Sequence, residues 1–361
     1  MRLTAIRLSD GRELRYYDGD GAPERTEADR RGLAQVATES ELRYDPLLDQ
    51  WIMVASHRQD RTYKPSAADC PLCPSTGERL TEIPAPDYDV VVFQNRFPAL
   101  APSDGDGLER GTLLARPGAG RCEVICFTAD HDASVASLRP EQVALVVQAW
   151  LDRSRALAEQ PGVEQIFCFE NSGPEIGVTL DHPHGQIYAY PFVTPRAARM
   201  LGAAKQYRAR YGRNLFEDRL ADECRDGRRI VLETEHWTAF VPFAARWPYE
   251  VHAYPIQRVP DLPSLSPAAL AELPELYLDL LGRFERLFEL PAPYISAWHQ
   301  APLHHPDRSE FATHLELFTV RRTSDKLKYL AGSESGMDAF ANDVAPEAAA
   351  AALRELRPIP A

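Results

Sequence analysis

CEVICFTADHDASVASLRPEQVA (residues 122–144) aligns without a gap on YEVHAYPIQRVPDLPSLSPAALA (residues 249–271). The two stretches lie 127 positions apart (249 − 122). The matching pairs are Glu123 with Glu250, Ser137 with Ser264, Leu138 with Leu265 and Pro140 with Pro267. A shared spacing over so many positions predicts one strand–loop–helix unit that occurs twice.

The segments that follow each copy extend the repeat. Residues 140–159 carry apolar side chains at helical spacing behind a proline, which predicts an amphipathic helix on a sheet. After the helix come an apolar stretch, QIFCFEN or YISAWHQ, and a histidine-bearing strand, HPHGQIYAY or HLELFTV. The sequence therefore predicts an α+β fold of two repeated domains, residues 1–195 and 196–361, with antiparallel sheets covered by helices. The polar first 45 or so residues are expected to form a surface arm.

Charge and composition narrow the function classes. The chain has 361 residues and a formal net charge of −13, which disfavours nucleic acid and membrane surfaces as partners. No apolar run has membrane-spanning length, and MRLTAIRLSDGREL lacks the apolar core of a signal peptide. The six cysteines do not resemble a disulfide framework in a chain this long. We expect a cytoplasmic protein, in which a Cys-x-x-Cys pair indicates metal or redox chemistry.

DHPHGQIYAY (residues 181–190) concentrates the chemistry. His182 and His184 are two residues apart, so on a strand they share a face. Pro183 cannot donate to a neighbouring strand, which predicts a sheet edge or a bulge. A neutral imidazole at position 184 is competent as nucleophile, general base or metal ligand, and residue type alone leaves a structural histidine open. Gly185 allows close backbone approach, and Gln186 offers an uncharged donor to a phosphoryl oxygen.

HPHGQ, preceded by FENSGPEIG at residues 169–177, resembles the active-site motif of galactose-1-phosphate uridylyltransferases, a branch of the histidine triad superfamily. Further stretches similar to that family are ASHRQDR, CPLC, VVFQNRF, CFTADHD, ETEHW, VPFAARWPYEVH, AWHQAP and KYLAGSE. The resemblance implies a double displacement in galactose metabolism (the Leloir pathway). His184 attacks the α-phosphorus of UDP-glucose, and the uridylyl-histidine passes UMP to galactose 1-phosphate.

Two other functions stay open at this point. Gln186 matches the transferases, whereas relatives that hydrolyse nucleotides usually have a third histidine there. A transferase of different substrate, such as a plant-type ADP-glucose phosphorylase, uses the same histidine chemistry. A zinc-bearing binding module without turnover is the other alternative, against which the intact HPHGQ argues.

Metal ligands come partly from spacing and partly from the resemblance. Cys70 and Cys73 form a Cys-x-x-Cys pair, for which metal binding, redox chemistry and a buried pair without metal are alternatives. The resemblance adds His131 and His182. Four protein ligands close a tetrahedron and leave no position for substrate, so this zinc would be structural.

A second metal site is left open. Some family members hold another metal in the C-terminal half, and the matching positions here are His299, His314 and Glu316. If His182 matches His314, then Glu316 stands where the first copy has His184. Glu316 replaces a histidine of those members, and Met200 stands where they have a glutamate.

The resemblance also places substrate contacts. Arginines near the phosphates supply the bidentate donors that a diphosphate needs, with an exposed charge run as the alternative. The aromatic strand is expected to bind uridine, with a plain core strand as the alternative. The C-terminal pair is expected to handle the hexose, in some relatives across a subunit boundary, which implies a homodimer. The residues are Arg58 and Arg61 (phosphates), Phe93 and Asn95 (uridine), Asn171 and Thr179 (phosphate side), and Lys328 and Glu334 (hexose).

Overall fold

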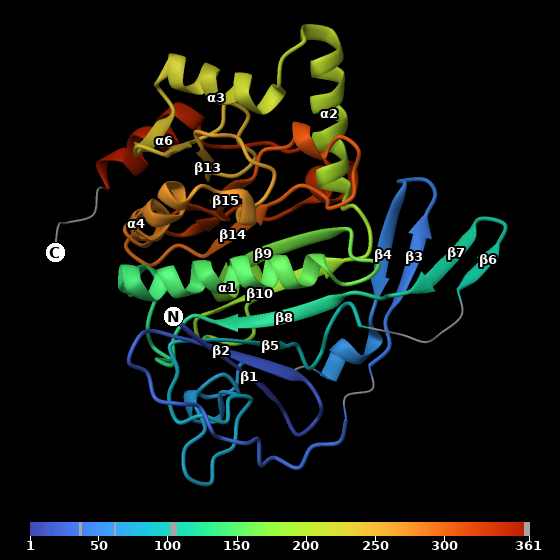
Figure 1. Cartoon of the computed structure of the whole chain (residues 1–361). Coiled ribbons are helices and arrows are strands. Elements are labelled where there is room, and N and C mark those ends of the chain that lie inside the picture. Colours follow the sequence, from blue (N-terminus) through green and yellow to red (C-terminus); the bar gives the residue numbers. More distant parts are fainter. Residues whose placement is uncertain (36–37, 61–62, 102–106, 357–361) are drawn as a thin grey trace.

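A computed structural model of the chain describes residues 1–35, 38–60, 63–101 and 107–356 (Figure 1). One antiparallel sheet of eleven strands runs through the molecule in the order β1-β2-β5-β8-β10-β9-β14-β15-β13-β12-β11. Its strands are β1 (Arg2–Arg7), β2 (Glu13–Asp18), β5 (Val90–Gln94), β8 (Arg121–Cys126), β9 (Gln165–Ser172), β10 (His184–Tyr190), β11 (Ile230–Glu233), β12 (Trp237–Phe240), β13 (Tyr249–Pro255), β14 (Tyr294–His299) and β15 (His314–Thr319).

The strand order shows the predicted duplication. From the outside to the middle, β5-β8-β10-β9 in the first half is repeated as β12-β13-β15-β14 in the second. Strands β9 and β14 pair with each other, so the two copies join edge to edge in one continuous sheet. The α+β class with antiparallel strands and covering helices is thereby confirmed.

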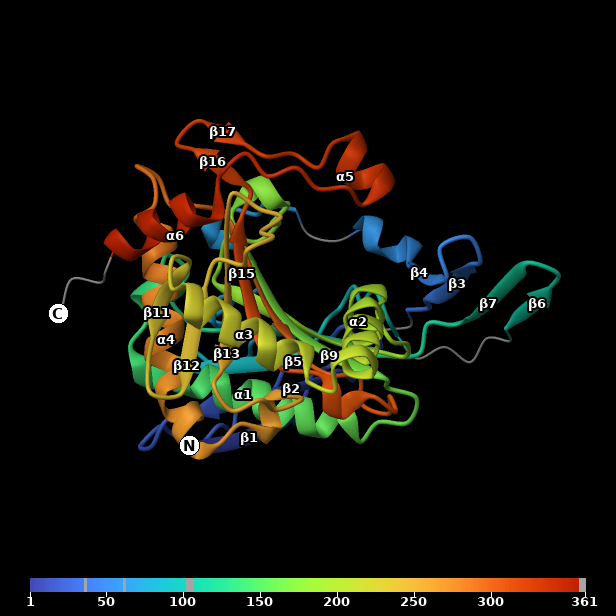
Figure 2. The same cartoon turned by 90° about the horizontal axis from the view of Figure 1, so that it is seen from above.

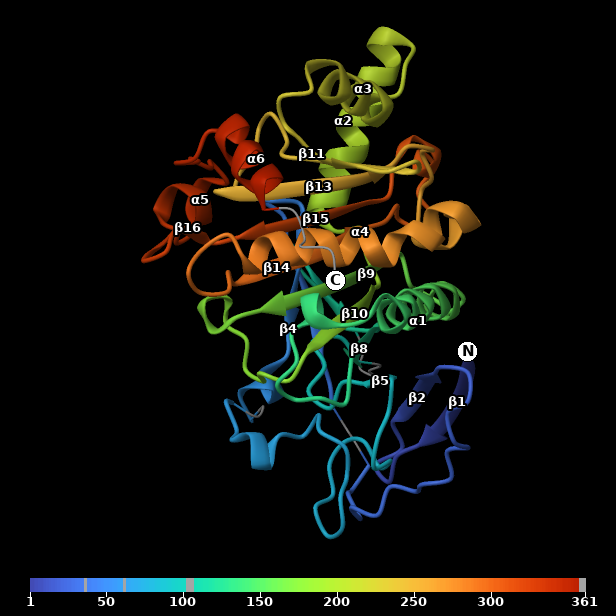
Figure 3. The ribbon, with the colours of Figure 1, turned by 90° about the vertical axis from the view of Figure 1, so that its left-hand side faces the viewer.

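Two long helices, one from each copy, lie side by side on one face of the sheet (Figures 1 and 3). They are α1 (Pro140–Ala158) and α4 (Pro267–Glu285), and each begins with a proline, whose missing N–H costs nothing in the first turn. Their apolar stripes and the sheet enclose the largest hydrophobic core, with Trp150, Trp237 and Trp298 in edge-on or tilted contact.

The gapless alignment holds for the helices but not for the strands before them. Ile125 and Val251 both pack into the core under α1 and α4, so matching the strands by face shifts them by one position relative to the helices. Because a one-residue slip turns every side chain over, Glu123 and Glu250 point to opposite faces. Glu123 accepts hydrogen bonds from Arg153 of α1, whereas Glu250 contacts His252 on the far face.

The far face is covered unequally. Over the second half lie α2 (Pro195–Tyr211) and α3 (Leu215–Asp226), which pack on Phe240 and Tyr254. Over the first half, the long loop before β5 packs on a smaller core that includes Tyr16. The expectation of a surface arm for the first 45 residues is wrong for β1 and β2, because β2 pairs with β5 and buries Leu14, Tyr16 and Tyr17.

A second sheet projects from the body beside this face (Figure 2). Its order is β4-β3-β7-β6. The bounds of these strands are β3 (Glu41–Asp45), β4 (Gln50–Val54), β6 (Leu108–Arg110) and β7 (Leu113–Pro117). The remaining elements are the hairpin of β16 (Arg321–Thr323) and β17 (Lys326–Leu327), and helices α5 (Gly332–Met337) and α6 (Pro346–Glu355). Among the described residues, no helix is both long enough and apolar enough to span a membrane.

Candidate active site and metal centre

A cavity of about 390 Å³ opens on the far face of the first copy. Its floor is formed by side chains of β5, β8, β10 and β9, and its walls by loops that precede β5 and β10. Seven residues that the sequence predicts for the site line this cavity together: Arg58, Phe93, Asn95, Asn171, Thr179, His184 and Gln186. A volume of this size suits a small organic ligand.

His184 is the first residue of β10 and is held in one orientation. Its Nδ1 lies 2.7 Å from the carbonyl oxygen of His182. A carbonyl can only accept, so Nδ1–H donates and the lone pair is on Nε2. Burial lowers the pKa of His184, which favours the neutral ring. An imidazole of this kind is prepared to act as a nucleophile through Nε2.

The residues around His184 differ from the sequence prediction in two respects. His182 precedes β10, so the expectation that the two histidines share one strand is wrong. Pro183 lies just before β10, so the strand pairs with β8 and β9 in the interior of the sheet, and the predicted edge or bulge is wrong. Gly185 is required by protein packing, because a Cβ there would lie 2.8 Å from the Phe127 ring and 2.9 Å from the carbonyl oxygen of Phe169. The small residue thus allows close packing on the helix-covered face of the sheet, next to His184.

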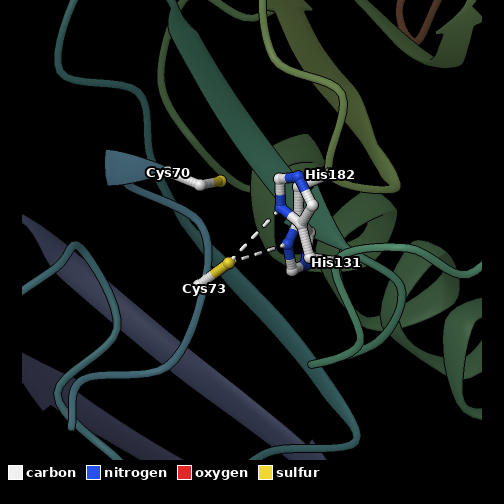
Figure 4. A group of neighbouring side chains, drawn as sticks. All are labelled: Cys70, Cys73, His131 and His182. Atoms are coloured by element: carbon white, nitrogen blue, oxygen red, sulfur yellow. Dashed lines mark hydrogen bonds between the residues drawn. The ribbon is translucent and has the colours of Figure 1, made fainter. Parts of the chain in front are cut away.

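Cys70, Cys73, His131 and His182 converge beside the cavity (Figure 4). One ligand atom of each lies within 4.8 Å of all the others. Cys73 Sγ is 3.4 Å from Nδ1 of His131 and 3.5 Å from Nδ1 of His182. Tetrahedral zinc, with bonds near 2.3 Å to sulfur and near 2.0 Å to nitrogen, places such atoms about 3.5 Å apart. The donor set therefore fits zinc.

The tautomer of His182 also suits a metal. Its Nε2 lies 2.8 Å from the carbonyl oxygen of Thr128, so Nε2 carries the proton and Nδ1 is free to bind. Burial lowers the pKa of His182 to about 4, which keeps the ring neutral. Burial also raises the pKa of the Cys70 thiol to about 11, and a bound cation would offset that cost.

A second buried cluster lies on the far face of the second copy. Glu316 is surrounded by three imidazoles, with Nε2 of His299, His314 and His252 at 3.3, 3.4 and 3.6 Å from its oxygens. Within the described part of the chain, His314 Nε2 and Glu316 Oε1 are buried without a hydrogen-bond partner. Arg196 contacts the other oxygen of Glu316 at 2.5 Å. His252 was not expected from the sequence.

Register explains why Glu316 lies at this point. His184 pairs with Cys126, and Glu316 pairs with His252. Cys126 and His252 correspond when the strands are matched by face, so Glu316 is the counterpart of His184. Met200, the position matched to a glutamate of other family members, packs in the apolar cluster of α2 and α3.

Two predicted residues lie apart from these groups, and a third is not described. Lys328 Nζ donates to Glu334 Oε1 at 3.0 Å, and neither residue lines the cavity. Both side chains are almost completely buried. Arg61 lies outside the residues that the structure describes.

Sequence reasoning missed part of the cavity lining. Pro71 and Leu72, between the two cysteines, and Glu82 further along the same loop all face the cavity. Arg96 and Tyr188 also line the cavity, beside Asn95 and Gln186. The position of Leu72 within CPLC and of Arg96 within VVFQNRF could have suggested them. Glu82 had no such signal, because it reaches the site through ion pairs with Arg12 and Arg31.

Comparisons with known proteins show the family to which the chain belongs. Models of the N-terminal and C-terminal domains of galactose-1-phosphate uridyl transferase match residues 31–194 and 201–359. The galactose-1-phosphate uridylyltransferase of Streptomyces lividans is 50% identical over 99% of this chain and 98% of its own. That of Thermotoga maritima is 39% identical over 87% of this chain and 98% of its own. A solved uridylyltransferase has a TM-score of 0.78 at 32% identity, covering 88% of this chain and 98% of its own. The chain is therefore a member of the galactose-1-phosphate uridylyltransferase family of enzymes.

Proposed function

We propose that the protein transfers UMP from UDP-glucose to galactose 1-phosphate through a covalent uridylyl-His184 intermediate, as a step of galactose metabolism. The observation that carries this proposal is the orientation of His184, whose Nδ1–H is held by the His182 carbonyl while Nε2 is left for the cavity. Family membership supports the same activity.

Both displacements balance without a proton transfer. In the first, the Nε2 lone pair bonds to the α-phosphorus, and the bond from that phosphorus to the glucose 1-phosphate oxygen breaks. In the second, a phosphate oxygen of galactose 1-phosphate attacks, and the electron pair returns to Nε2. Leaving group and acceptor are both ionised phosphates, so no general acid or base is required. Gln186, an uncharged donor, suits such a site better than a third histidine.

Substrate positions follow from the cavity lining. Arg58, Asn171 and Thr179 are proposed to hold the phosphates, and Phe93 and Asn95 the uridine. Arg58 suits this role because, among the described residues, its guanidinium makes two long hydrogen bonds of 3.4 Å, to Phe97 O and to the Tyr188 hydroxyl. Arg61 remains a proposed phosphate contact.

The test is the mass of the intact protein after incubation with UDP-glucose alone. An increase of one uridylyl group is expected in the parent protein and in His236→Ala, whose imidazole pairs with Glu272 far along the chain. No increase is expected in His184→Ala. An adduct formed from ADP-glucose and not from UDP-glucose would move the assignment to an ADP-glucose phosphorylase-like transferase. No adduct from either sugar nucleotide would contradict a covalent His184.

Zinc is proposed at Cys70, Cys73, His131 and His182, where it would hold the segment before β10 in place. When bound, it supplies structural cross-linking and no open coordination position. We also propose that the Glu316 cluster takes a second divalent metal, with His252 as an additional ligand. The ligand atoms of His252, His314 and Glu316 lie within 4.8 Å of one another, and two buried polar atoms of the cluster lack hydrogen-bond partners among the described residues. The alternative is that Arg196, which contacts Glu316, supplies the positive charge that balances the buried carboxylate.

Metal analysis separates these cases. Two metal ions per chain in the parent and one in Glu316→Gln would establish the second site. One metal ion per chain in both proteins would mean that Arg196, and not a metal, balances the negative charge of Glu316. No zinc in the purified parent, after reconstitution with zinc, would contradict the first site.

A homodimer is proposed, with the projecting sheet as the contact between copies. Large apolar side chains at its tips are exposed, among them Leu47, Leu48 and Leu113, the first at 92%. Loop tips are normally polar, so another surface is expected to cover them. Sedimentation should show a dimer for the parent and for Leu290→Asp, an exposed leucine elsewhere, and a monomer for the double variant Leu47→Asp, Leu113→Asp.

The dimer would give Lys328 and Glu334 a route to the hexose of the neighbouring copy, which remains a proposal. The domain boundary between residues 195 and 196 also remains a proposal, and it falls one residue inside α2. A cytoplasmic location is also proposed, and six free thiols are compatible with a reducing compartment.

A further inference from the structure

The loop that carries the two cysteine ligands is also a wall of the active-site cavity. Pro71 and Leu72, which separate Cys70 from Cys73, both line the cavity. Leu72 is buried. Any displacement of this short segment therefore changes the metal site and the cavity together.

One side chain fastens this wall. The Tyr88 hydroxyl lies 3.0 Å from the carbonyl oxygen of Leu72 and donates a hydrogen bond to it. The same hydroxyl lies 2.9 Å from Nε2 of His182. Since the Tyr88 proton points to Leu72, its oxygen accepts from His182 Nε2–H, which it shares with the Thr128 carbonyl.

The path continues to the nucleophile. His182 is joined to His184 by its carbonyl oxygen, which accepts from His184 Nδ1–H. Tyr88 lies two residues before β5, and its side chain is buried in the small core of the first copy. It therefore touches the cavity wall on one side and, on the other, the histidine that both faces the metal site and orients His184.

We propose that Tyr88 is a positioning residue, whose hydroxyl couples the cavity wall at Leu72 to His182 and so holds the nucleotide pocket and the metal site in one geometry. This inference rests on the proposed function for its kinetic consequences. Its consequence for metal retention is independent of the proposed function, because the contact between Tyr88 and His182 exists without any reaction.

The test replaces Tyr88 by phenylalanine, which removes the hydroxyl and keeps the ring. The Leu72 carbonyl then loses its hydrogen-bond donor, while His182 Nε2–H keeps the Thr128 carbonyl as its acceptor. We expect the KM for UDP-glucose to rise about three- to tenfold, the usual range for one buried hydrogen bond, with a smaller fall in kcat. Zinc, followed with a chromophoric chelator, is expected to leave about three- to tenfold faster than from the parent.

Tyr16→Phe is the matched control. Tyr16 is buried in the same small core, and its hydroxyl accepts from the backbone N–H of Ala85 at 3.2 Å without touching His182. Both variants should lose similar thermal stability, but only Tyr88→Phe should change KM and zinc release.

Two failures are distinguishable. Equal KM values and equal zinc-release rates for the two variants would overturn the role of Tyr88. Absence of a uridylyl adduct in the parent would instead contradict the proposed function, and the zinc-release comparison would still decide whether Tyr88 holds His182.

Discussion

Nδ1 of His184 and the carbonyl oxygen of His182, the two histidines of HPHGQ, are 2.7 Å apart. The bond joins residues two apart on one chain segment, so the backbone that presents the His182 imidazole to the metal site also fixes the tautomer of His184. The proposed metal site and the proposed nucleophile thus share one backbone segment. The neighbours of this pair give four predictions.

Gln186→Glu should abolish the reaction while leaving the fold intact. Glutamate has the shape of glutamine, but its carboxylate would repel the phosphates of a substrate bound beside His184, the proposed nucleophile, which lines the same cavity. We expect the rate of uridylyl-adduct formation to fall by at least about a hundredfold, as for loss of one transition-state donor. Gln160→Glu, past the end of α1, should form the adduct at the parental rate. Normal turnover by Gln186→Glu would remove Gln186 from the site.

Gly185→Ala should destabilise the protein. The added Cβ would meet Phe127 at 2.8 Å and the Phe169 carbonyl at 2.9 Å, and overpacking of this kind costs about 1–3 kcal/mol of unfolding free energy. Gly202→Ala is the control, because nothing lies within 4 Å of its Cβ within α2. There alanine should stabilise by about 0.5–1 kcal/mol. Urea unfolding measures both, and equal effects would contradict the packing role of Gly185.

Cys73→Ser should remove bound zinc and weaken the fold. Cys73 lies within 3.5 Å of both histidine ligands, so its loss breaks the tetrahedral set. We expect less than one zinc per chain by elemental analysis and a Tm lower by about 4 °C or more, since a 1 kcal/mol loss shifts Tm by about 2–4 °C in a chain of this class. Cys224→Ser, at an exposed cysteine, should change neither quantity. Retained zinc in Cys73→Ser would mean that Cys73 is not a ligand.

The sequence predicted the elements that repeat locally and missed the relations set by tertiary contact. Helices α1 and α4 begin at Pro140 and Pro267, as the alignment predicts, because proline, capping and apolar spacing are local signals. The opposite faces of Glu123 and Glu250 were not predictable in this way. Their orientation depends on one residue in the connection, which only packing against the helices determines.

The residues of the candidate site follow the same distinction between local signals and tertiary contacts. Residues within motifs, such as His184 and Asn95, lie in the cavity as expected. Glu82 and Tyr88 were missed because the side chains that hold them come from distant segments, Arg12 for Glu82 and His182 for Tyr88. No spacing rule connects such pairs. The prediction of a sheet edge at Pro183 failed for a different reason. Pro183 lies just before β10, so its missing N–H removes no hydrogen bond from the strand.

Glu170→Gln should flatten the dependence of stability on pH. Glu170 is buried where β9 meets β14 and accepts hydrogen bonds from Tyr277 and Tyr294. Burial raises its pKa from 4.5 to about 7. Below pH 4.5 the carboxyl is protonated in both the folded and the unfolded protein, so its full contribution to the free energy of unfolding is present. As pH rises towards 7 the unfolded chain ionises first, and that contribution is lost.

The parent should therefore lose on the order of 3 kcal/mol of unfolding free energy between pH 4.5 and 8 from this group, measured by urea unfolding at several pH values. Glu170→Gln has no proton to lose and should show a correspondingly smaller slope, with higher stability than the parent at pH 8. Glu159→Gln, at an exposed glutamate after α1, should follow the parent. A Glu170→Gln protein with the parental slope would mean that the buried carboxyl is already ionised at pH 5, held by its two tyrosine hydroxyls.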